Sequence, residues 1–205
     1  MGFIYLPAGR EAAVDKKEQI YEKALEMFIA KGYDQTPLSQ IARELNLTKA
    51  GLYHYFQSKE ELLFFLHQHN MEKDFIPVLE TAEKITDPEK RIIYFLKNYT
   101  VRAMTKNAAA KVLIHEIKRL KPEHQRIIKK TWRRAFNLIH DAISELESAG
   151  KIEGINKTFA TFAAIGMCSW TFYWFDYNRR ETGGELSDTY TKIFLNGLLS
   201  RPSLV

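Results

Sequence analysis

Apolar residues recur three and four positions apart along most of this chain, which is the spacing of a helix with one buried face. The first such pattern ends at Gly32, a residue type that favours the left-handed backbone after a helix. Its apolar face carries Ile20, Ala24, Met27 and Phe28. A shorter pattern over residues 38–45 is followed by Asn46, which tolerates the same backbone in a tight turn. No convincing strand alternation appears, so the sequence predicts an all-α protein.

Capping residues divide the next part of the chain into short helices. Thr36, with a proline directly after it, is predicted to cap the helix over residues 38–45. Thr48 is predicted to cap the following helix in the same way. Ser58 and Glu61 match a capping box, in which each side chain satisfies a backbone amide near the other, and a long helix follows them. Two short helices joined by a tight turn, with a third before them, indicate a helix-turn-helix.

Later helices are marked by similar signals. Their starts are predicted at Asp87-Pro88, Pro122, Asn156 and Ser187. Gly150 is predicted to end the helix that begins at Pro122, and Gly183 with Gly184 to end an aromatic helix that begins after Asn156.

The composition is that of a folded protein with a real core. Of 205 residues, 45% are hydrophobic and 27% charged. The single cysteine, Cys168, excludes a disulfide framework and a Cys-rich zinc module, and residues 1–7 do not match a secretory signal. We therefore expect a cytoplasmic protein without a bound metal or cofactor. Residues 158–175 carry no charge, and we interpret them as a helix buried between helices or subunits and not as a membrane span.

Charge is distributed unevenly along the chain. The net charge is +5, but residues 1–60 contain eight basic and eight acidic residues. Residues 106–134 contain ten basic residues against two acidic ones. The basic excess, which favours polyanionic partners, is therefore concentrated in the middle of the chain.

Residues 48–56 have the chemistry of a helix that enters the DNA major groove. Leu52 and Phe56 are expected to anchor it, which leaves its N-terminal turn exposed for base edges. Lys49 can reach guanine acceptors or a phosphate there, and Ala50 and Gly51 let the backbone come close. Further donors toward DNA are Thr36, Thr48, Tyr53, His54, Tyr55 and Lys59. Taken singly, each of these residues also has a structural interpretation as a cap, a packing residue or a solvated charge.

Residues 36–62, and more broadly residues 16–66, resemble the tetracycline-repressor (TetR) family of bacterial transcriptional regulators. The resemblance rests on Thr36-Pro37, on residues 47–56 and on the capping box at Ser58. It implies an all-α homodimer with a helix-turn-helix DNA-binding domain at residues 1–60 and an effector-binding and dimerisation domain at 61–205. It also implies that Thr36, Thr48, Lys49, Ala50, Tyr53, His54, Tyr55 and Lys59 approach the DNA. Ala50-Gly51 departs from the family pattern, in which Gly often precedes a polar residue.

Scattered segments beyond residue 66 resemble regulators that respond to acyl-CoA thioesters, namely residues 116–124, 166–174, 186–187 and 196–199. Such an effector needs an apolar tunnel and cations for its phosphates. Candidate tunnel residues are Phe65, Phe95, Tyr99, Trp132, Phe136 and Ile139. Candidate phosphate-binding residues are Arg119, Arg126, Lys130, Arg133 and Arg134. The alternative is that the aromatic residues are ordinary core and the charges a solvated helix face.

Residues 158–175 and 187–199 are candidates for the dimer interface. Gly166 permits close helix approach, while Phe162, Trp170 and Trp174 are candidate anchors. The alternative is that these aromatic residues pack only within their own subunit.

The leading hypothesis is therefore a repressor that binds a palindromic DNA operator as a homodimer and is released by a small hydrophobic effector such as an acyl-CoA, in control of fatty-acid metabolism. Two alternatives stay open: a small thioester hydrolase and a structural DNA binder without an effector. The hydrolase finds little support, because Cys168 lies in an apolar helix with no His near it in sequence. We expect no catalytic residues and no membrane partner.

Overall fold

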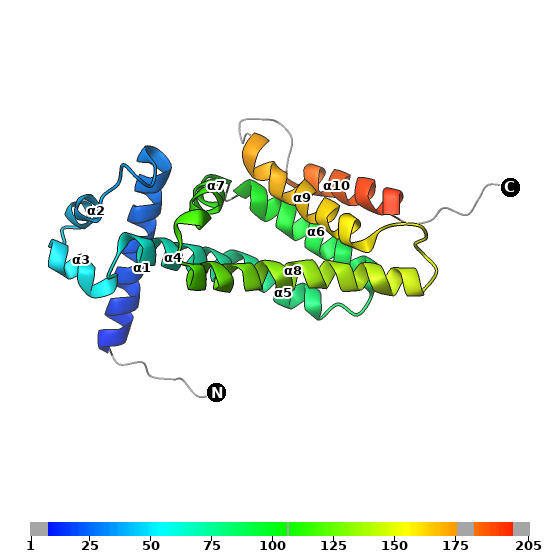
Figure 1. Ribbon diagram of the computed structural model, residues 1–205, viewed down its shortest axis with the longest axis horizontal. Helices are drawn as coiled ribbons and strands as arrows, with labels where there is room; N and C mark the ends of the chain where they lie inside the picture. The colour runs from blue at the N-terminus through cyan, green and yellow to red at the C-terminus, as the bar shows by residue number, and fades with distance from the viewer. Residues whose placement is uncertain (1–7, 106, 176–182, 199–205) are drawn as a thin grey trace. The chain divides into compact units, whose positions relative to one another are not determined.

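The structure, a computed structural model, describes residues 8–105, 107–175 and 183–198, and every regular element among them is helical (Figure 1). The first part contains α1 (Ala8–Lys31), α2 (Leu38–Glu44), α3 (Lys49–Tyr55) and α4 (Lys59–Asn70). It continues with the π-helix η1 (Met71–Phe75), α5 (Ile76–Glu83), α6 (Pro88–Thr105) and α7 (Asn107–Glu116). The 3₁₀ turn η2 (Ile117–Arg119) precedes α8 (Pro122–Ser148), α9 (Lys157–Trp174) and α10 (Gly183–Leu198). The predicted all-α fold is confirmed.

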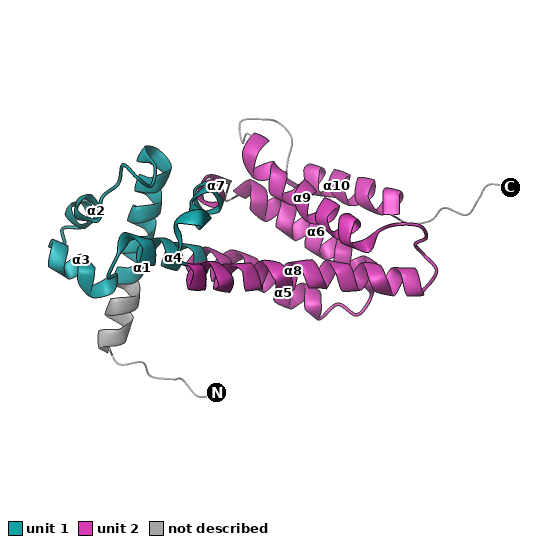
Figure 2. Cartoon of the chain, in the orientation of Figure 1, with its two compact units in different colours: residues 1–67, 112–121 teal, residues 68–111, 122–205 magenta. Residues whose placement is uncertain are grey.

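The chain forms two compact units (Figure 2). Unit 1 comprises residues 1–67 and 112–121, and unit 2 comprises residues 68–111 and 122–205. The predicted division at residue 60 concerned function and stays a prediction. The compact units differ from it in two respects: the first segment of unit 1 extends to residue 67, and residues 112–121 belong with the N-terminal helices.

Most of the predicted helix ends are confirmed by backbone geometry. Gly32 and Gly150 have φ angles of +85° and +69°, and Asn46 is the one non-glycine residue with positive φ, at +52°, among those that the structure describes. The Asn156 side chain accepts a hydrogen bond from the Phe159 amide at 3.1 Å, as a cap for α9 requires. Asp87 does the same for the Lys90 amide at 3.0 Å.

Three predictions about helix ends need correction. Gly183 and Gly184 do not close the aromatic helix, which ends at Trp174; they are the first residues of α10, and Ser187 lies inside it. Thr36 does not cap α2, because its hydroxyl donates back to the Gly32 carbonyl at 2.9 Å. The capping box is half confirmed: the Glu61 amide donates to Ser58 Oγ at 3.0 Å, but the Glu61 carboxylate accepts from Gln57.

The π-helix η1 interrupts what the sequence suggests is one long helix from Lys59 onward. Pro77 lies two residues after it, as the second residue of α5. In a regular α-helix the proline ring would collide with the carbonyl of residue 73 and would leave that turn without its hydrogen bond. The wider π turn, closed by the Ile76 amide on the Met71 carbonyl, accommodates the proline. The helix thus continues to Glu83 in spite of it.

Unit 2 is built around a buried aromatic cluster. Phe75 contacts Tyr99 and Trp132 at ring-centroid distances of 5.1 and 5.0 Å, and Tyr99 also contacts Phe95 and Phe172. Tyr99 is fully buried, and its hydroxyl is satisfied by Ser169 on α9 at 2.9 Å. Among the described helices, none is both long and apolar enough to cross a membrane.

Candidate functional site

Helices α2 and α3 form the helix-turn-helix of unit 1. Leu52 and Phe56 are 0% and 2% exposed, α3 packs against α2, and the Phe56 ring centroid lies 5.2 Å from that of Phe65 on α4. The turn between the helices is closed by the Leu47 amide, which donates to the Ala42 carbonyl at 2.9 Å. The anchoring predicted for Leu52 and Phe56 is therefore present.

The N-terminal turn of α3 is the exposed part of this motif. Thr48, Lys49 and Ala50 are exposed, and Thr48 Oγ1 accepts a hydrogen bond from the Gly51 amide at 3.0 Å. A Cβ on Gly51 would lie 3.2 Å from that hydroxyl oxygen, so a larger residue here would require the Thr48 side chain to move by a few tenths of an ångström.

The other predicted DNA-facing residues of α3 are less uniform. His54 is exposed, while Tyr53 and Tyr55 are half-buried. Lys49 Nζ lies 5.7 Å from the Tyr53 ring centroid, and the His54 and Tyr55 rings are 5.5 Å apart. These side chains therefore contact one another in two pairs along α3.

A hollow of about 480 Å³ joins α3 to the starts of α2 and α4. It is lined by Asp34, Pro37, Leu38, Ser39, Lys49, Tyr53, Gln57, Ser58 and Lys59. Lys59 Nζ donates to the Tyr33 carbonyl and lies 4.2 Å from the Tyr33 ring centroid. Burial lowers the pKa of Lys59. Lys59 is therefore partly engaged by its own unit, at the edge of a polar hollow that faces Lys49.

Thr36 is unsuited to the DNA contact predicted for it. Its side chain is 0% exposed, and its hydroxyl donates to the Gly32 carbonyl. A hydroxyl that is buried and already donating offers a phosphate no access. We therefore remove Thr36 from the candidate DNA contacts.

Residues 112–121 form the rest of unit 1. Arg119 makes an ion pair with Asp34 at 2.5 Å and another with Glu116 at 2.8 Å, and its guanidinium lies 5.7 Å from the Tyr33 ring centroid. The Lys121 amide donates to the Glu60 carboxylate at 2.9 Å. Arg119, predicted to bind an effector phosphate, is thus committed to the α1–α2 turn, a contact between residues 85 positions apart that no local pattern announces.

The predicted tunnel residues fall in both units. Phe65 belongs to unit 1, where its ring centroid is 5.2 Å from that of Phe56. In unit 2, Phe95 and Ile139 are 0% exposed, and Trp132 and Phe136 are half-buried. Sequence reasoning missed Phe75, whose ring contacts those of two cluster members, Tyr99 and Trp132. The available signal was Pro77, which lies two residues after the end of the π turn at Phe75.

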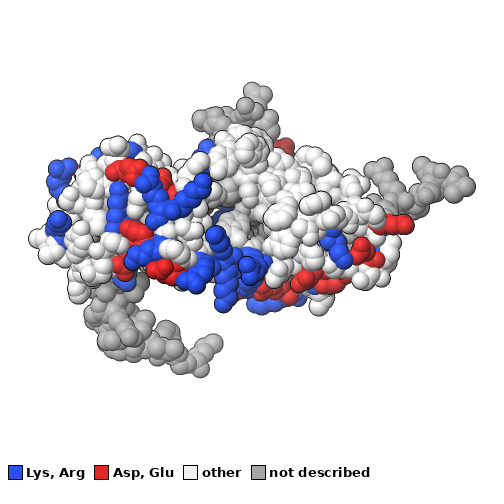
Figure 3. All heavy atoms as spheres, viewed as in Figure 1, with Lys and Arg blue, Asp and Glu red and all other residues white. Residues whose placement is uncertain are grey.

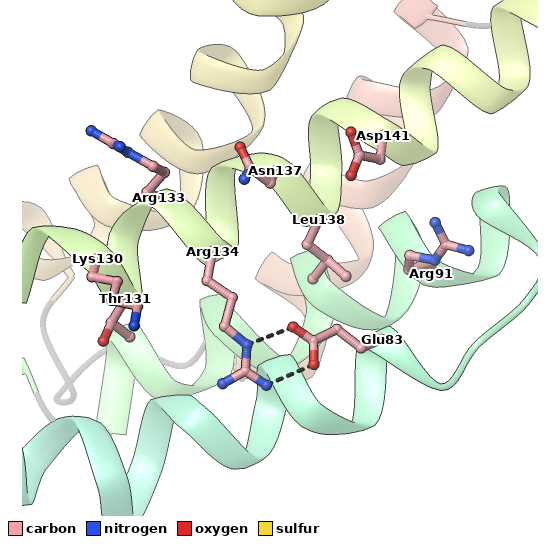
Figure 4. A pocket seen from close by; sticks show the side chains of 9 residues that line it. All are labelled: Glu83, Arg91, Lys130, Thr131, Arg133, Arg134, Asn137, Leu138 and Asp141. Atoms are coloured by element: carbon pink, nitrogen blue, oxygen red, sulfur yellow. Dashed lines mark hydrogen bonds and ion pairs between the residues drawn. The ribbon is translucent and has the colours of Figure 1, made fainter.

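A cleft of about 640 Å³ on unit 2 gathers several of the predicted cations (Figure 4). It is lined by Glu83, Arg91, Lys130, Thr131, Arg133, Arg134, Asn137, Leu138 and Asp141. Figure 4 shows Arg134 bound through two nitrogens to Glu83, at 2.5 and 2.6 Å. This pairing lowers the pKa of Glu83 and raises that of Arg134. Arg126 does not line the cleft.

Lys130 and Arg133 are the unpaired cations of this cleft. Neither has an ion-pair partner among the residues that the structure describes. Figure 3 shows Lys and Arg gathered over the first half of α8, where the exposed Arg126 and Lys129 also lie. The arrangement suits a multiply charged anion better than a single carboxylate, because Arg91 and Arg134 already have carboxylate partners in Glu145 and Glu83.

Helix α9 presents large apolar side chains to solvent. Phe162, Trp170 and Trp174 are 61%, 65% and 41% exposed, and Phe159 on the same helix is 72% exposed. A Cβ at Gly166 would meet no atom within 4 Å, so this part of α9 is open. An exposed apolar face of this kind is typical of a protein–protein interface.

Cys168 lies on the opposite, buried face of α9. Its side chain is 0% exposed, and burial raises the pKa of its thiol to about 12. A thiol that is protonated at neutral pH and closed to solvent is a poor nucleophile. The described residues also contain no group of three or more His, Cys, Asp or Glu side chains placed to hold a metal.

Two family models match this chain. Residues 20–65 match the bacterial regulatory proteins of the tetR family, and residues 86–198 match the tetracyclin repressor-like C-terminal domain. The chain is 25% identical to the fatty acid metabolism regulator protein of Bacillus subtilis (strain 168), over 89% of this chain and 95% of that protein. It is 36% identical to the uncharacterized HTH-type transcriptional regulator YuxN of the same strain, over 36% of this chain and only 25% of that protein.

A solved structure extends the similarity to most of the fold. The crystal structure of AibR in complex with isovaleryl coenzyme A and operator DNA superimposes with a TM-score of 0.78 and 26% identity, over 86% of this chain and 96% of that one. The matches to the helix-turn-helix and to the C-terminal helices together extend over both compact units. This chain therefore belongs to the TetR family of bacterial transcriptional regulators.

Proposed function

We propose that this protein is a repressor that binds a palindromic operator as a homodimer and is released by an acyl-CoA. The observation that carries the DNA part is the exposed turn at Thr48, Lys49 and Ala50, fixed on a helix whose opposite face is buried. In a dimer, two such helices read half-sites one DNA turn, about 34–36 Å, apart. The proposed contacts are Thr48, Lys49, Ala50, Tyr53, His54, Tyr55 and Lys59.

Electrophoretic mobility shift with the DNA upstream of the protein's own gene tests this step. Lys49→Ala is expected to weaken specific binding by about tenfold or more, because a bidentate base contact is worth about 1–3 kcal/mol. Lys31→Ala is the matched control, since it removes the same charge from an exposed position at the end of α1. Equal affinity of the two variants, or no protected palindrome in a footprint, would contradict the proposal.

The dimer is proposed to form through the exposed aromatic face of α9, with α10 contributing Ile193, which is 59% exposed. Trp170→Glu places a charge in the middle of this face and is expected to give monomers in analytical ultracentrifugation. Ile127→Glu is the control, because Ile127 is a 46% exposed apolar residue on α8. Dimerisation that survives Trp170→Glu would place the interface elsewhere.

The proposed effector has an apolar chain and a phosphate-rich end. Support comes from the half-buried Trp132 and Phe136, from the unpaired Lys130 and Arg133 of the cleft, and from the coenzyme A complex of AibR. The effector releases DNA if it binds better to a state in which the two α3 helices are wrongly spaced. Isovaleryl-CoA and palmitoyl-CoA are expected to dissociate the DNA complex, and coenzyme A alone is not. Release of free coenzyme A from these thioesters would favour the hydrolase instead.

A further inference from the structure

One buried polar cluster in unit 2 belongs neither to the helix-turn-helix nor to the cleft on α8. Arg102 on α6 is only 9% exposed, and its Nη2 donates to Asn70 twice: to the backbone carbonyl at 3.1 Å and to the side-chain Oδ1 at 2.8 Å. The guanidinium carbon also lies 5.3 Å from the Phe75 ring centroid. A cation is thus held inside the helical unit by an amide and an aromatic face.

Asn70 carries a second, independent signal. Its side chain is 6% exposed, and its Nδ2 is buried without a hydrogen-bond partner among the described residues. The orientation of the amide is fixed, because Oδ1 must face the guanidinium that donates to it. Buried polar groups are normally satisfied, so a buried donor without an acceptor indicates that something else supplies the acceptor.

The local backbone points to the same place. Asn70 is the last residue of α4 and directly precedes the π-helix η1, whose last residue is Phe75. Single π turns within α-helices occur frequently at functional sites. This one places Asn70 at its start and Phe75, which contacts Tyr99, Trp132 and Arg102, at its end. Donors and aromatic surface therefore converge on one position.

We propose that Asn70 Nδ2, with the Arg102 guanidinium beside it, binds the carbonyl oxygen of the effector's acyl group. An amide nitrogen and a guanidinium only donate, so the ligand must present an acceptor. The aromatic surroundings require that this acceptor be attached to an apolar body. A thioester and a free fatty acid share this chemistry, and the experiment distinguishes them. This inference rests on the proposed effector response and assigns the polar end of the acyl chain within it.

The test compares two substitutions of the same kind in the full-length protein. Asn70→Asp replaces the donor by an acceptor of the same shape and keeps an oxygen for Arg102. Asn98→Asp adds the same charge one turn before Arg102 on α6, at a half-buried amide that donates to the Tyr94 carbonyl. Isothermal titration calorimetry measures the Kd of isovaleryl-CoA, palmitoyl-CoA, palmitate and coenzyme A for each protein.

Asn70→Asp is expected to raise the Kd of the acyl ligand at least tenfold, while Asn98→Asp leaves it within twofold and both variants still shift operator DNA. Equal affinity of wild type and Asn70→Asp overturns this inference and leaves the proposed function standing. If palmitate binds in an Asn70-dependent manner and neither thioester binds, the inference holds and the acyl-CoA effector is wrong. Binding of none of the four probes overturns both.

A measurement on the wild-type protein covers the case in which Asn70→Asp does not fold. In ¹⁵N-labelled protein, the side-chain amide signal of Asn70 is expected to move downfield when the acyl ligand binds, because Nδ2 gains an acceptor. The Asn98 amide, which already donates to Tyr94, serves as the internal reference. An unmoved Asn70 signal in the presence of saturating ligand contradicts the proposal.

Discussion

The two units of this protein are stabilised over different distances along the chain. In unit 1 the caps of the proposed DNA-contacting turn and of the helix after it are bonds over three residues, Gly51 to Thr48 and Glu61 to Ser58, although Lys59 and Arg119 also join this unit over 26 and 85 positions. In unit 2 the central bonds join residues that are 68 and 70 positions apart, Thr100 to Cys168 and Tyr99 to Ser169. The proposed DNA-contacting turn is thus capped locally, whereas the part proposed to meet the effector depends on the packing of distant helices.

The largest expected effects come from core substitutions that destabilise one unit and leave the other folded. Leu52→Ala leaves a cavity in the core of unit 1 and is expected to cost about 2–5 kcal/mol of stability, with loss of DNA binding. Phe172→Ala removes a side chain that is 1% exposed in unit 2 and is expected to cost about 3–5 kcal/mol. Urea denaturation measures both costs, and calorimetry measures effector binding. If effector binding disappears with Leu52→Ala but persists with Phe172→Ala, the assignment of effector binding to unit 2 is wrong.

The same contrast explains how much could be predicted from the sequence. Anchors such as Leu52, caps such as Thr48 and Asn156, and the turn at Asn46 depend on neighbours a few positions away, and these predictions are confirmed. The prediction that Thr36 caps α2 is wrong, because its hydroxyl donates to the Gly32 carbonyl just after α1. The predicted effector role of Arg119 took no account of Asp34, a partner 85 positions away. The π turn could be predicted only by considering Pro77 together with a helix that looks continuous in the sequence pattern.

Low pH is expected to affect the stability of the two units differently, because one buried histidine belongs to unit 1. His67 is 4% exposed, and burial lowers its pKa to about 4, against a hydrogen bond with the Leu113 backbone that raises it. In the unfolded chain His67 has a pKa of 6.5. Between pH 6.5 and about 4 it is therefore protonated in the unfolded chain but neutral in the folded protein. The free energy of unfolding therefore keeps its full value above pH 6.5. It decreases as the pH falls from 6.5 to about 4, by roughly 3 kcal/mol in total.

Denaturation of the wild-type protein between pH 7 and pH 4 measures this loss, with DNA binding as the readout for unit 1. His67→Gln is expected to flatten the dependence over that range, because the variant has no proton to bind at this position. His124→Gln is the control, at a half-buried His of unit 2 near the start of α8. A pH dependence that stays the same in His67→Gln would remove this histidine from the explanation and leave the carboxylates as its source.

The smallest expected effect comes from removing one helix N-cap in each unit. Thr48 caps α3 and Asn156 caps α9, each by accepting a hydrogen bond from the amide three residues on, at 3.0 and 3.1 Å. Either alanine substitution is expected to cost about 1 kcal/mol of stability, because each helix loses one satisfied amide. Their effects on DNA should differ. Thr48→Ala loosens the turn that carries Lys49 and Ala50 and should weaken operator binding several-fold, whereas Asn156→Ala should leave the affinity of the dimer for DNA unchanged. Equal effects on DNA would mean that the α3 turn acts through overall stability alone, and local specification of the DNA-reading surface would then be wrong.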